Sequence, residues 1–256
     1  MRAVILAGGI GSRLSEETTF KPKPLVEIGG KPIIWHIMKI YSSYGINEFI
    51  ICCGYKGFMI KEYFMNYSKI NSDVEVDLRN GNIKVLKKQS EKWKIKLIDT
   101  GLKTMTGGRI KRLARIIKPN ETFCLTYGDG LADINIKKLI KFHKKNKKLA
   151  TISAVYPDGR FGALKVKDSL VKEFQEKPRG DGNLINGGFF VLNSKVLKFI
   201  KDDDTIWEQA PLQELAKINQ LSAYNHKGFW QPMDSLRDKN LLENLVLQKK
   251  APWIKW

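Results

Sequence analysis

A short apolar run near the start of the chain ends in a glycine loop that basic side chains follow. The run is Ala-Val-Ile-Leu-Ala over residues 3–7. The loop glycines and the cations behind them are Gly8, Gly9, Gly11, Arg13, Lys21 and Lys23. A buried strand that opens into such a loop leaves backbone N–H groups free to face an anion, and fixed cations add to the attraction. The pattern predicts a site for a nucleotide and its phosphates.

The loop matches neither of the two common glycine loops that bind nucleotides. It lacks the Gly-Lys-Ser/Thr that ends a Walker A loop. Leu14 stands where the dinucleotide fingerprint requires its third glycine. A plain tight turn would not account for the cations that follow. We therefore assign the nucleotide to a set of neighbouring residues, namely Leu6, Ala7, Gly8, Gly9, Ile10, Gly11, Ser12 and Arg13.

Asp129 lies where another buried strand, expected over residues 122–127, comes to its end. Open α/β sheets present ligands at this edge, and Gly128 and Gly130 leave room for a metal ion and a phosphate to approach the backbone. Asp234 follows an aromatic segment in the second half of the chain. It has a competing interpretation as the cap of a helix that follows it.

Strand-like and helical patterns alternate along the chain, which favours parallel βα units. We expect strands over residues 3–7, 48–53, 94–99, 122–127, 150–155, 163–166, 170–176, 186–192 and 221–226. Helices are expected over residues 33–44, 57–67, 108–117, 135–147, 194–201 and 207–218, and after Ser235. Residues 74–86 predict a β-hairpin with a tight Asn80-Gly81 turn. We expect one domain over residues 1–256, with a nucleotide-binding half at about 1–130 and an acceptor-binding half at about 131–256.

The composition excludes several classes of binding partner. The net charge is +19, but the lysines are spread along the chain and no nucleic-acid-binding motif accompanies them, so we expect no nucleic-acid partner. Cys52, Cys53 and Cys124 fit neither a disulfide framework nor a metal site. No apolar stretch approaches membrane-spanning length, and the N-terminus has no signal-peptide layout. We therefore expect a cytoplasmic protein without a membrane-inserted segment.

Longer segments carry a resemblance to a known family. Residues 6–14, followed by Lys-Pro-Lys-Pro-Leu-Val-Glu-Ile-Gly-Gly-Lys-Pro-Ile over residues 21–33, resemble the signature of the sugar-phosphate nucleotidylyltransferases. Further segments are similar to the glucose-1-phosphate cytidylyltransferases within that family: residues 104–109, 127–130, 159–164, 174–178, 185–190 and 228–234. The resemblance covers nearly the whole chain. It implies a Rossmann-like, GT-A-like fold with a mixed, mainly parallel sheet flanked by helices.

The resemblance also implies a reaction. A cytidylyl group passes from CTP to α-D-glucose 1-phosphate, which gives CDP-glucose and pyrophosphate for deoxysugar and surface-polysaccharide synthesis. Lys23 falls at the family's phosphate-binding lysine, and Arg13, Lys23 and Asp129 form the implied catalytic set. Lys21 is either a helper or a solvated loop lysine. In that family Asp129 and Asp234 together hold Mg²⁺, and the assemblies are hexamers, which implies a homo-oligomer here.

Two further groups of residues are assigned to the substrates by the same resemblance. On the nucleotide side, Thr104, Arg109 and Gly128 are expected to assist at the base or the phosphates. Entry into a helix is the alternative explanation for the two glycines inside the segment 104–109.

On the acceptor side the implied residues are Gly162, Glu176, Lys177 and Asn186. A carboxylate accepts hydrogen bonds from sugar hydroxyls, and a lysine binds the sugar phosphate. Glu176 and Lys177 can both do so only if the strand ends or bends there. UTP or dTTP as the donor, another phosphorylated acceptor, or a non-catalytic nucleotide-sugar binding protein are the open alternatives.

Overall fold

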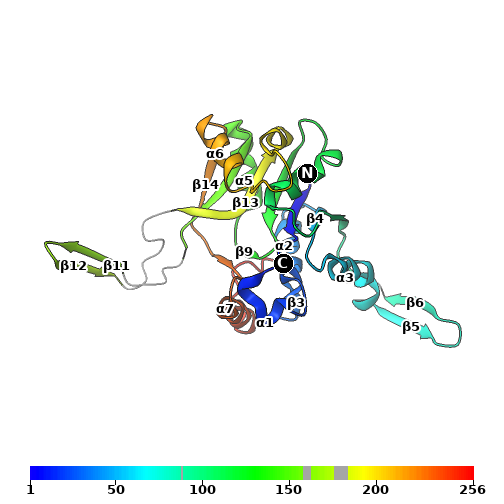
Figure 1. Cartoon of the computed structure of the whole chain (residues 1–256). Helices are drawn as coiled ribbons and strands as arrows, with labels where there is room; N and C mark the ends of the chain where they lie inside the picture. Colours follow the sequence, from blue (N-terminus) through cyan, green and yellow to red (C-terminus); the bar gives the residue numbers. More distant parts are fainter. Residues whose placement is uncertain (88, 158–162, 176–183) are drawn as a thin grey trace.

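One sheet of seven strands forms the centre of the molecule (Figure 1). The structure is a computed structural model, and it describes residues 1–87, 89–157, 163–175 and 184–256. In order across the sheet, the strands are β14 (Leu221–His226), β10 (Ala150–Val155), β13 (Ile185–Asn193), β8 (Thr122–Tyr127), β1 (Ala3–Ala7), β4 (Glu48–Cys53) and β7 (Lys94–Asp99). Neighbouring strands run parallel except at β13, which is antiparallel to both β8 and β10. The expected mixed, mainly parallel sheet is confirmed.

Both faces of the sheet are covered, because successive residues of β1 enter different cores. Ala3, Ile5 and Ala7 contribute to one buried apolar cluster, whereas Val4 and Leu6 contribute to another. The first cluster also contains residues of α2 (Ile33–Ser42), α3 (Gly57–Ile70), α5 (Ile136–Asn146) and α7 (Leu236–Leu247). The second contains residues of α4 (Thr106–Lys111) and α6 (Ala210–Lys217). A continuous apolar run is therefore what a central strand of this sheet requires.

The strands follow the prediction more closely than the helices do. β1, β4, β7, β8, β10 and β14 have the predicted bounds. The helix expected over residues 108–117 was wrong in extent, because α4 ends at Lys111 and a 3₁₀ helix covers Arg112–Arg115. Residues Ser194–Phe199 likewise form a 3₁₀ helix. α6 begins only at Ala210, where Pro211 in its first turn has the backbone angle that a helix start needs.

Two hairpins lie outside the central sheet: β11 (Ala163–Lys167) with β12 (Leu170–Gln175), and β5 (Asp73–Asp77) with β6 (Asn82–Lys87). The predicted hairpin at β5–β6 is confirmed, but its tight Asn80-Gly81 turn was wrong. Asp77 pairs with Asn82, so residues 78–81 form a longer loop. The Asp77 carboxylate stabilises this loop by accepting hydrogen bonds from Arg79 N and Asn80 Nδ2.

The remaining helix and strand elements in the described part of the chain are short. They are α1 (Ser15–Thr18), β2 (Glu27–Ile28), β3 (Lys31–Pro32), β9 (Gly130–Ala132), β15 (Trp230–Pro232) and the 3₁₀ helices Ser12–Leu14 and Lys23–Leu25. None of the described helices has the length and apolar character needed to cross a membrane. Cys52, Cys53 and Cys124 are buried free thiols.

His36 on α2 is buried in the first core and is held in its neutral form. Its Nδ1 accepts a hydrogen bond from Trp253 Nε1 at 3.3 Å, so Nε2 carries the proton and donates it to the Ile28 carbonyl oxygen at 2.8 Å. Burial lowers the pKa of His36. The unfolded chain therefore binds a proton at this residue more readily than the folded protein does.

We expect the free energy of unfolding to fall as the pH drops below about 6.5, the ordinary pKa of histidine, because unfolding then lets His36 take up a proton. This group contributes at most about 1.4 kcal/mol per pH unit. Urea unfolding of the wild type and of His36→Gln, each at about pH 5.5 and about pH 7, measures the effect. Burial also lowers the pKa of His143, so a smaller pH dependence should persist in the variant. The same pH dependence in both proteins would contradict the assignment.

Candidate functional site

A short antiparallel pair, β9 with β15, brings Asp129 and Asp234 side by side. Gly130, directly after Asp129, pairs with Pro232 of β15. The Met233 N–H donates to the Asp129 carbonyl oxygen at 2.8 Å, which extends the pairing toward Asp234. Two carboxylates that are far apart in the sequence therefore meet at the edge of the sheet where β1 and β8 end, the edge at which open α/β sheets bind ligands.

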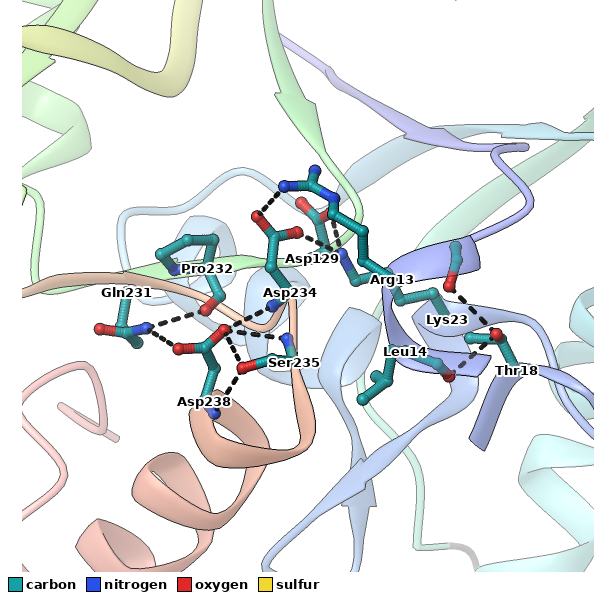
Figure 2. A network of polar contacts seen from close by, with 11 residues as sticks. Arg13, Leu14, Thr18, Lys23, Asp129, Gln231, Pro232, Asp234, Ser235 and Asp238 are labelled. Atoms are coloured by element: carbon teal, nitrogen blue, oxygen red, sulfur yellow. Dashed lines mark hydrogen bonds and ion pairs between the residues drawn. The ribbon is translucent and has the colours of Figure 1, made fainter. Parts of the chain in front are cut away.

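The ammonium group of Lys23 lies between these carboxylates (Figure 2). Its Nζ is 2.7 Å from Asp129 Oδ2 and 2.7 Å from Asp234 Oδ1. Arg13 Nη1 approaches the other oxygen of Asp234 at 3.0 Å. The Lys23 side chain is only 10% exposed, whereas that of Arg13 is 77% exposed. Lys23 is therefore a fixed part of the site, and Arg13 has room to reorient toward a ligand.

The same three residues show which kind of metal the site suits. Burial alone would lower the pKa of Lys23, but the carboxylates of Asp129 and Asp234 outweigh that effect and raise it. A cation thus already lies between two hard oxygen donors, which suit a hard divalent cation better than a softer metal. Within the described residues no group of three His, Cys, Asp or Glu side chains could hold a metal. A divalent ion here would need substrate phosphates or water beside the two aspartates.

The helix that follows Asp234 is capped by other residues. Ser235 Oγ accepts a hydrogen bond from Asp238 N, and the Asp238 carboxylate accepts one from Ser235 N, which makes a capping box at the start of α7. Asp234 gives Asp238 only its backbone N–H. The interpretation of Asp234 as the helix cap was therefore wrong. Figure 2 shows its carboxylate between Lys23 and Arg13.

Arg109 supports the glycine loop from within the protein. Its guanidinium donates to the Gly8 carbonyl at 2.9 Å, to Thr100 Oγ1 at 2.8 Å and to the Gly101 carbonyl at 2.8 Å. The Tyr55 N–H also donates to the Gly8 carbonyl, at 3.1 Å. Burial lowers the pKa of Arg109, although a guanidinium stays charged at neutral pH. Arg109 thus acts as a support for the loop, and its contact with the nucleotide stays a prediction.

Two of the loop glycines are explained by the space around them. A Cβ atom on Gly8 would lie 2.1 Å from Arg109 Nη1. Gly11 has a φ of +72°, and a Cβ atom there would also approach Thr18 Cγ2 to 3.0 Å. Thr18 Oγ1 in turn donates to the Gly11 carbonyl at 3.1 Å. Glycine is therefore required at position 8 by close packing and at position 11 by the turn.

A cavity of about 560 Å³ opens between the glycine loop and the two aspartates, a volume within the usual range for small-molecule sites. The predicted residues that line it are Leu6, Ala7, Gly8, Gly9, Gly11, Ser12, Arg13, Lys23, Thr104, Arg109, Gly128, Asp129, Asn186 and Asp234. Ile10 is exposed and does not belong to this lining. Gly162, Glu176 and Lys177, which were predicted for the acceptor, lie outside the described residues.

Volume alone would not identify this cavity. A second cavity, of about 580 Å³, lies between Trp35, Tyr67 and Glu91 and contains none of the predicted site residues. Lys21 also lies apart from the site, since its Nζ pairs with Glu27 Oε1 at 3.6 Å. The structure thus favours the solvated-lysine interpretation of Lys21 over a role as a helper.

The prediction missed six residues that line the cavity, namely Pro24, Met105, Thr106, Tyr127, Trp230 and Pro232. Each lies inside a segment that the sequence had already singled out. Tyr127 directly precedes Gly128 and Asp129, so its position at the end of β8 was the signal that could have identified it. Trp230 is fixed by its Nε1, which donates to the Gly187 carbonyl at 2.7 Å.

Comparison with known proteins identifies relatives over the full chain. A family model described as nucleotidyl transferase matches residues 2–234. A glucose-1-phosphate cytidylyltransferase of Salmonella typhimurium is 58% identical over 256 residues, and the match covers 100% of both chains. A mannose-1-phosphate guanyltransferase of Aspergillus oryzae is 30% identical, and that match covers 96% of this chain and 64% of the relative.

Solved structures share the fold. HddC from Yersinia pseudotuberculosis matches with a TM-score of 0.68 at 25% identity, over 96% of this chain and 99% of that chain. UDP-glucose pyrophosphorylase complexed with UDP-glucose matches with a TM-score of 0.68 at 18% identity, over 97% and 98% of the two chains, and bears on the fold alone. The Rossmann-like nucleotidyltransferase fold is thereby confirmed. The chain belongs to the nucleotidyl transferase family, with glucose-1-phosphate cytidylyltransferases among its full-length relatives.

Proposed function

We propose that this protein transfers a cytidylyl group from CTP to α-D-glucose 1-phosphate, with CDP-glucose and pyrophosphate as products. The observation that carries the proposal is the 58% identity, over the whole of both chains, to a glucose-1-phosphate cytidylyltransferase. The cavity agrees with it, because fixed cations, two carboxylates and a glycine loop line one space. Use of the product in deoxysugar and surface-polysaccharide synthesis, like a cytoplasmic location, stays a prediction.

The reaction needs positioning and charge neutralisation more than it needs covalent chemistry. An oxygen of the sugar phosphate attacks the α-phosphorus of the nucleoside triphosphate, and pyrophosphate leaves. Two anions that repel each other must be held together while charge shifts at the transferring group. We assign the triphosphate to residues 8–13 and to Lys23, with Arg13 reorienting onto the phosphates. Thr104, Arg109 and Gly128 are proposed for the nucleotide, and Asn186 for the sugar phosphate.

We further propose that Asp129 and Asp234 hold Mg²⁺. Their facing oxygen atoms already flank one cation, the Lys23 ammonium. When bound, the metal would reduce repulsion between the phosphates and the carboxylates. We also propose that the chain forms one domain, since strands from both predicted halves share the central sheet.

Pyrophosphate release tests the proposed reaction. Purified protein with Mg²⁺ is assayed with CTP, UTP, dTTP and GTP, each against glucose, mannose and galactose 1-phosphate. We expect CTP with glucose 1-phosphate to give the highest kcat/KM. A higher value for another pair would favour a different donor or acceptor. No release with any pair, together with measurable CDP-glucose binding, would favour a non-catalytic binding protein.

We also propose that the chain forms a homo-oligomer in which the β5–β6 hairpin makes contacts between copies. The hairpin projects from α3 (Figure 1). Its strand pairing places four residues on one apolar face, and all four are exposed: Val74, Val76, Ile83 and Val85. The other face carries charged residues such as Glu75 and Lys84, which pair across the strands. A lone two-stranded hairpin is marginally stable in water, so its apolar face favours a partner.

Light scattering on the double variant Val76→Asp/Val85→Asp tests this interface. Two buried, unpaired carboxylates would oppose association, so we expect a smaller assembly than the wild type forms. Glu75→Gln, on the charged face of the same strand, serves as the control and should keep the wild-type mass. An unchanged mass for the double variant would exclude the hairpin from the interface.

A further inference from the structure

A chain of polar side chains connects the acceptor wall of the cavity with its nucleotide wall. Asn186, at the start of β13, donates from Nδ2 to Tyr127 Oη at 3.0 Å. Tyr127, at the end of β8, donates from Oη to Glu208 Oε1 at 2.5 Å. Thr106, at the start of α4, donates from Oγ1 to the other oxygen of Glu208, Oε2, at 2.6 Å. The Glu208 carboxylate therefore accepts one hydrogen bond from a hydroxyl group of each wall.

The direction of the hydrogen bonds is fixed at the Asn186 end. The Gly188 N–H donates to Asn186 Oδ1 at 2.8 Å, so the amide nitrogen is the atom that faces Tyr127. An amide nitrogen only donates. Tyr127 Oη must then accept from Asn186, and its own proton is directed to Glu208.

The direction is fixed at the Glu208 end as well. The Trp207 N–H donates to Thr106 Oγ1 at 2.9 Å, so the Thr106 hydroxyl gives its own proton to Glu208. Burial, together with the Glu208 carboxylate, raises the pKa of Tyr127, which keeps its hydroxyl protonated. An ionised carboxylate is the group that can accept from both hydroxyls at once.

Glu208 itself is not among the described residues that line the cavity, whereas Asn186, Tyr127 and Thr106 are. Its segment is nevertheless packed tightly against the cavity wall. The Met105 N–H donates to the Asp203 carbonyl at 2.8 Å. A Cβ atom on Gly108 would lie 2.5 Å from Asp203 Cα, which gives this glycine a packing role. Glu208 is thus held in place and acts on the cavity only through its two hydroxyl partners.

We infer that Glu208 is a positioning residue that, through Tyr127, orients the amide of Asn186 so that it presents an N–H donor to the acceptor substrate. Asn186 Nδ2 carries two hydrogens, and one of them is donated in the hydrogen bond to Tyr127 Oη. The second is directed to an oxygen lone pair on a sugar hydroxyl or on the sugar phosphate. The same carboxylate fixes Thr106 in the loop assigned to the nucleotide. The inference rests on the proposed function and names a determinant of its acceptor specificity.

Glu208→Gln tests the inference with little change in size. A glutamine side chain accepts through one oxygen only, so one of the two hydroxyls loses its acceptor. We expect kcat/KM for glucose 1-phosphate to fall about 10- to 100-fold, as for loss of a hydrogen bond to a charged group. We also expect a weaker preference for glucose 1-phosphate over mannose and galactose 1-phosphate. A purely structural role would lower all three rates alike.

Tyr127→Phe removes only the hydroxyl and should give the same pattern. Both substitutions interrupt the same chain of hydrogen bonds. The kcat/KM of the double variant should therefore be no more than about twofold below that of the less active single variant. If Glu208→Gln does not fold by circular dichroism, Tyr127→Phe, which keeps the ring, provides the same measurement. Glu214→Gln, an exposed residue of α6, makes the same charge change and should keep wild-type kinetics.

The outcomes separate the inference from the proposed function. A wild-type protein that is inert with CTP and glucose 1-phosphate counts against the function itself. An active wild type, with Glu208→Gln and Glu214→Gln equal to it, overturns the inference. Equal losses with the three sugar phosphates also overturn it. The inference is supported if the loss in kcat/KM differs among the three sugar phosphates and the double variant is less than about twofold below the less active single variant.

Discussion

Asp129→Asn is expected to lower kcat by about 10²- to 10³-fold while the protein stays folded, because the change removes one of the two carboxylates that face the phosphate site. Asparagine has nearly the same shape, and Lys23 keeps its contact with Asp234 at 2.7 Å. The loss should therefore come from charge rather than from packing. Steady-state kinetics over a range of Mg²⁺ concentrations measures it, and half-maximal activity should require more metal than in the wild type.

Asp204→Asn is a matched control, since Asp204 is exposed and lies outside the cavity lining. It should leave both kcat and the metal requirement unchanged. If Asp129→Asn turned over at the wild-type rate and at the wild-type metal concentration, neither the metal role nor the catalytic role of Asp129 would stand.

Gly8→Ala is expected to destabilise the protein by about 2–4 kcal/mol, because the new methyl group overlaps a guanidinium that cannot easily move. The methyl carbon would lie 2.1 Å from Arg109 Nη1 and 2.3 Å from Arg109 Cζ. Arg109 is bound at the same time to Thr100 Oγ1 and the Gly101 carbonyl, so its displacement would break those hydrogen bonds too. We also expect kcat/KM to fall by about 100-fold or more, since the loop loses its support.

Gly9→Ala provides the comparison within the same loop. A Cβ atom on Gly9 has no neighbour within 4 Å, so its unfolding free energy in urea should stay within about 0.5 kcal/mol of the wild type. Stability is the decisive measurement here, because it does not depend on how the loop contacts a nucleotide. Equal unfolding free energies for Gly8→Ala and Gly9→Ala would show that Arg109 does not restrain Gly8.

The elements that local sequence determines were predicted well. The apolar runs of β1 and β4 are each followed directly by a glycine, Gly8 and Gly54, so the ends of both strands could be read from the sequence. The glycine loop and Asp129 follow such strands, and both line the cavity as expected. The helix expected to start at residue 108 starts at Thr106 instead, where the Met105 and Gly108 N–H groups donate to carbonyls of the distant segment 203–205, and local patterns do not record such contacts.

The parts of the site that depend on long-range packing could not be predicted from local sequence. Asp234 meets Asp129 only because β15 pairs with β9, and the resemblance alone had linked them. Arg109 was assigned to the nucleotide, but the support that it gives to Gly8 requires three strand ends to converge and could not be predicted. Glu208 shows no local signal at all, since its partners lie on β8 and α4.

The reversed direction of β13 has a consequence for how substrate preference can diverge in this fold. In a fully parallel sheet, a residue at the start of a strand lies at the edge remote from the ligand. Because β13 is antiparallel to β8, its first residues reach the ligand edge, and Asn186 meets Tyr127 there. On the proposed assignment of Asn186 to the sugar phosphate, acceptor choice depends on where one strand begins, and nucleotide choice on where others end. Substitutions near residue 186 should therefore act first on acceptor choice, and reach the nucleotide side only through Tyr127 and Glu208.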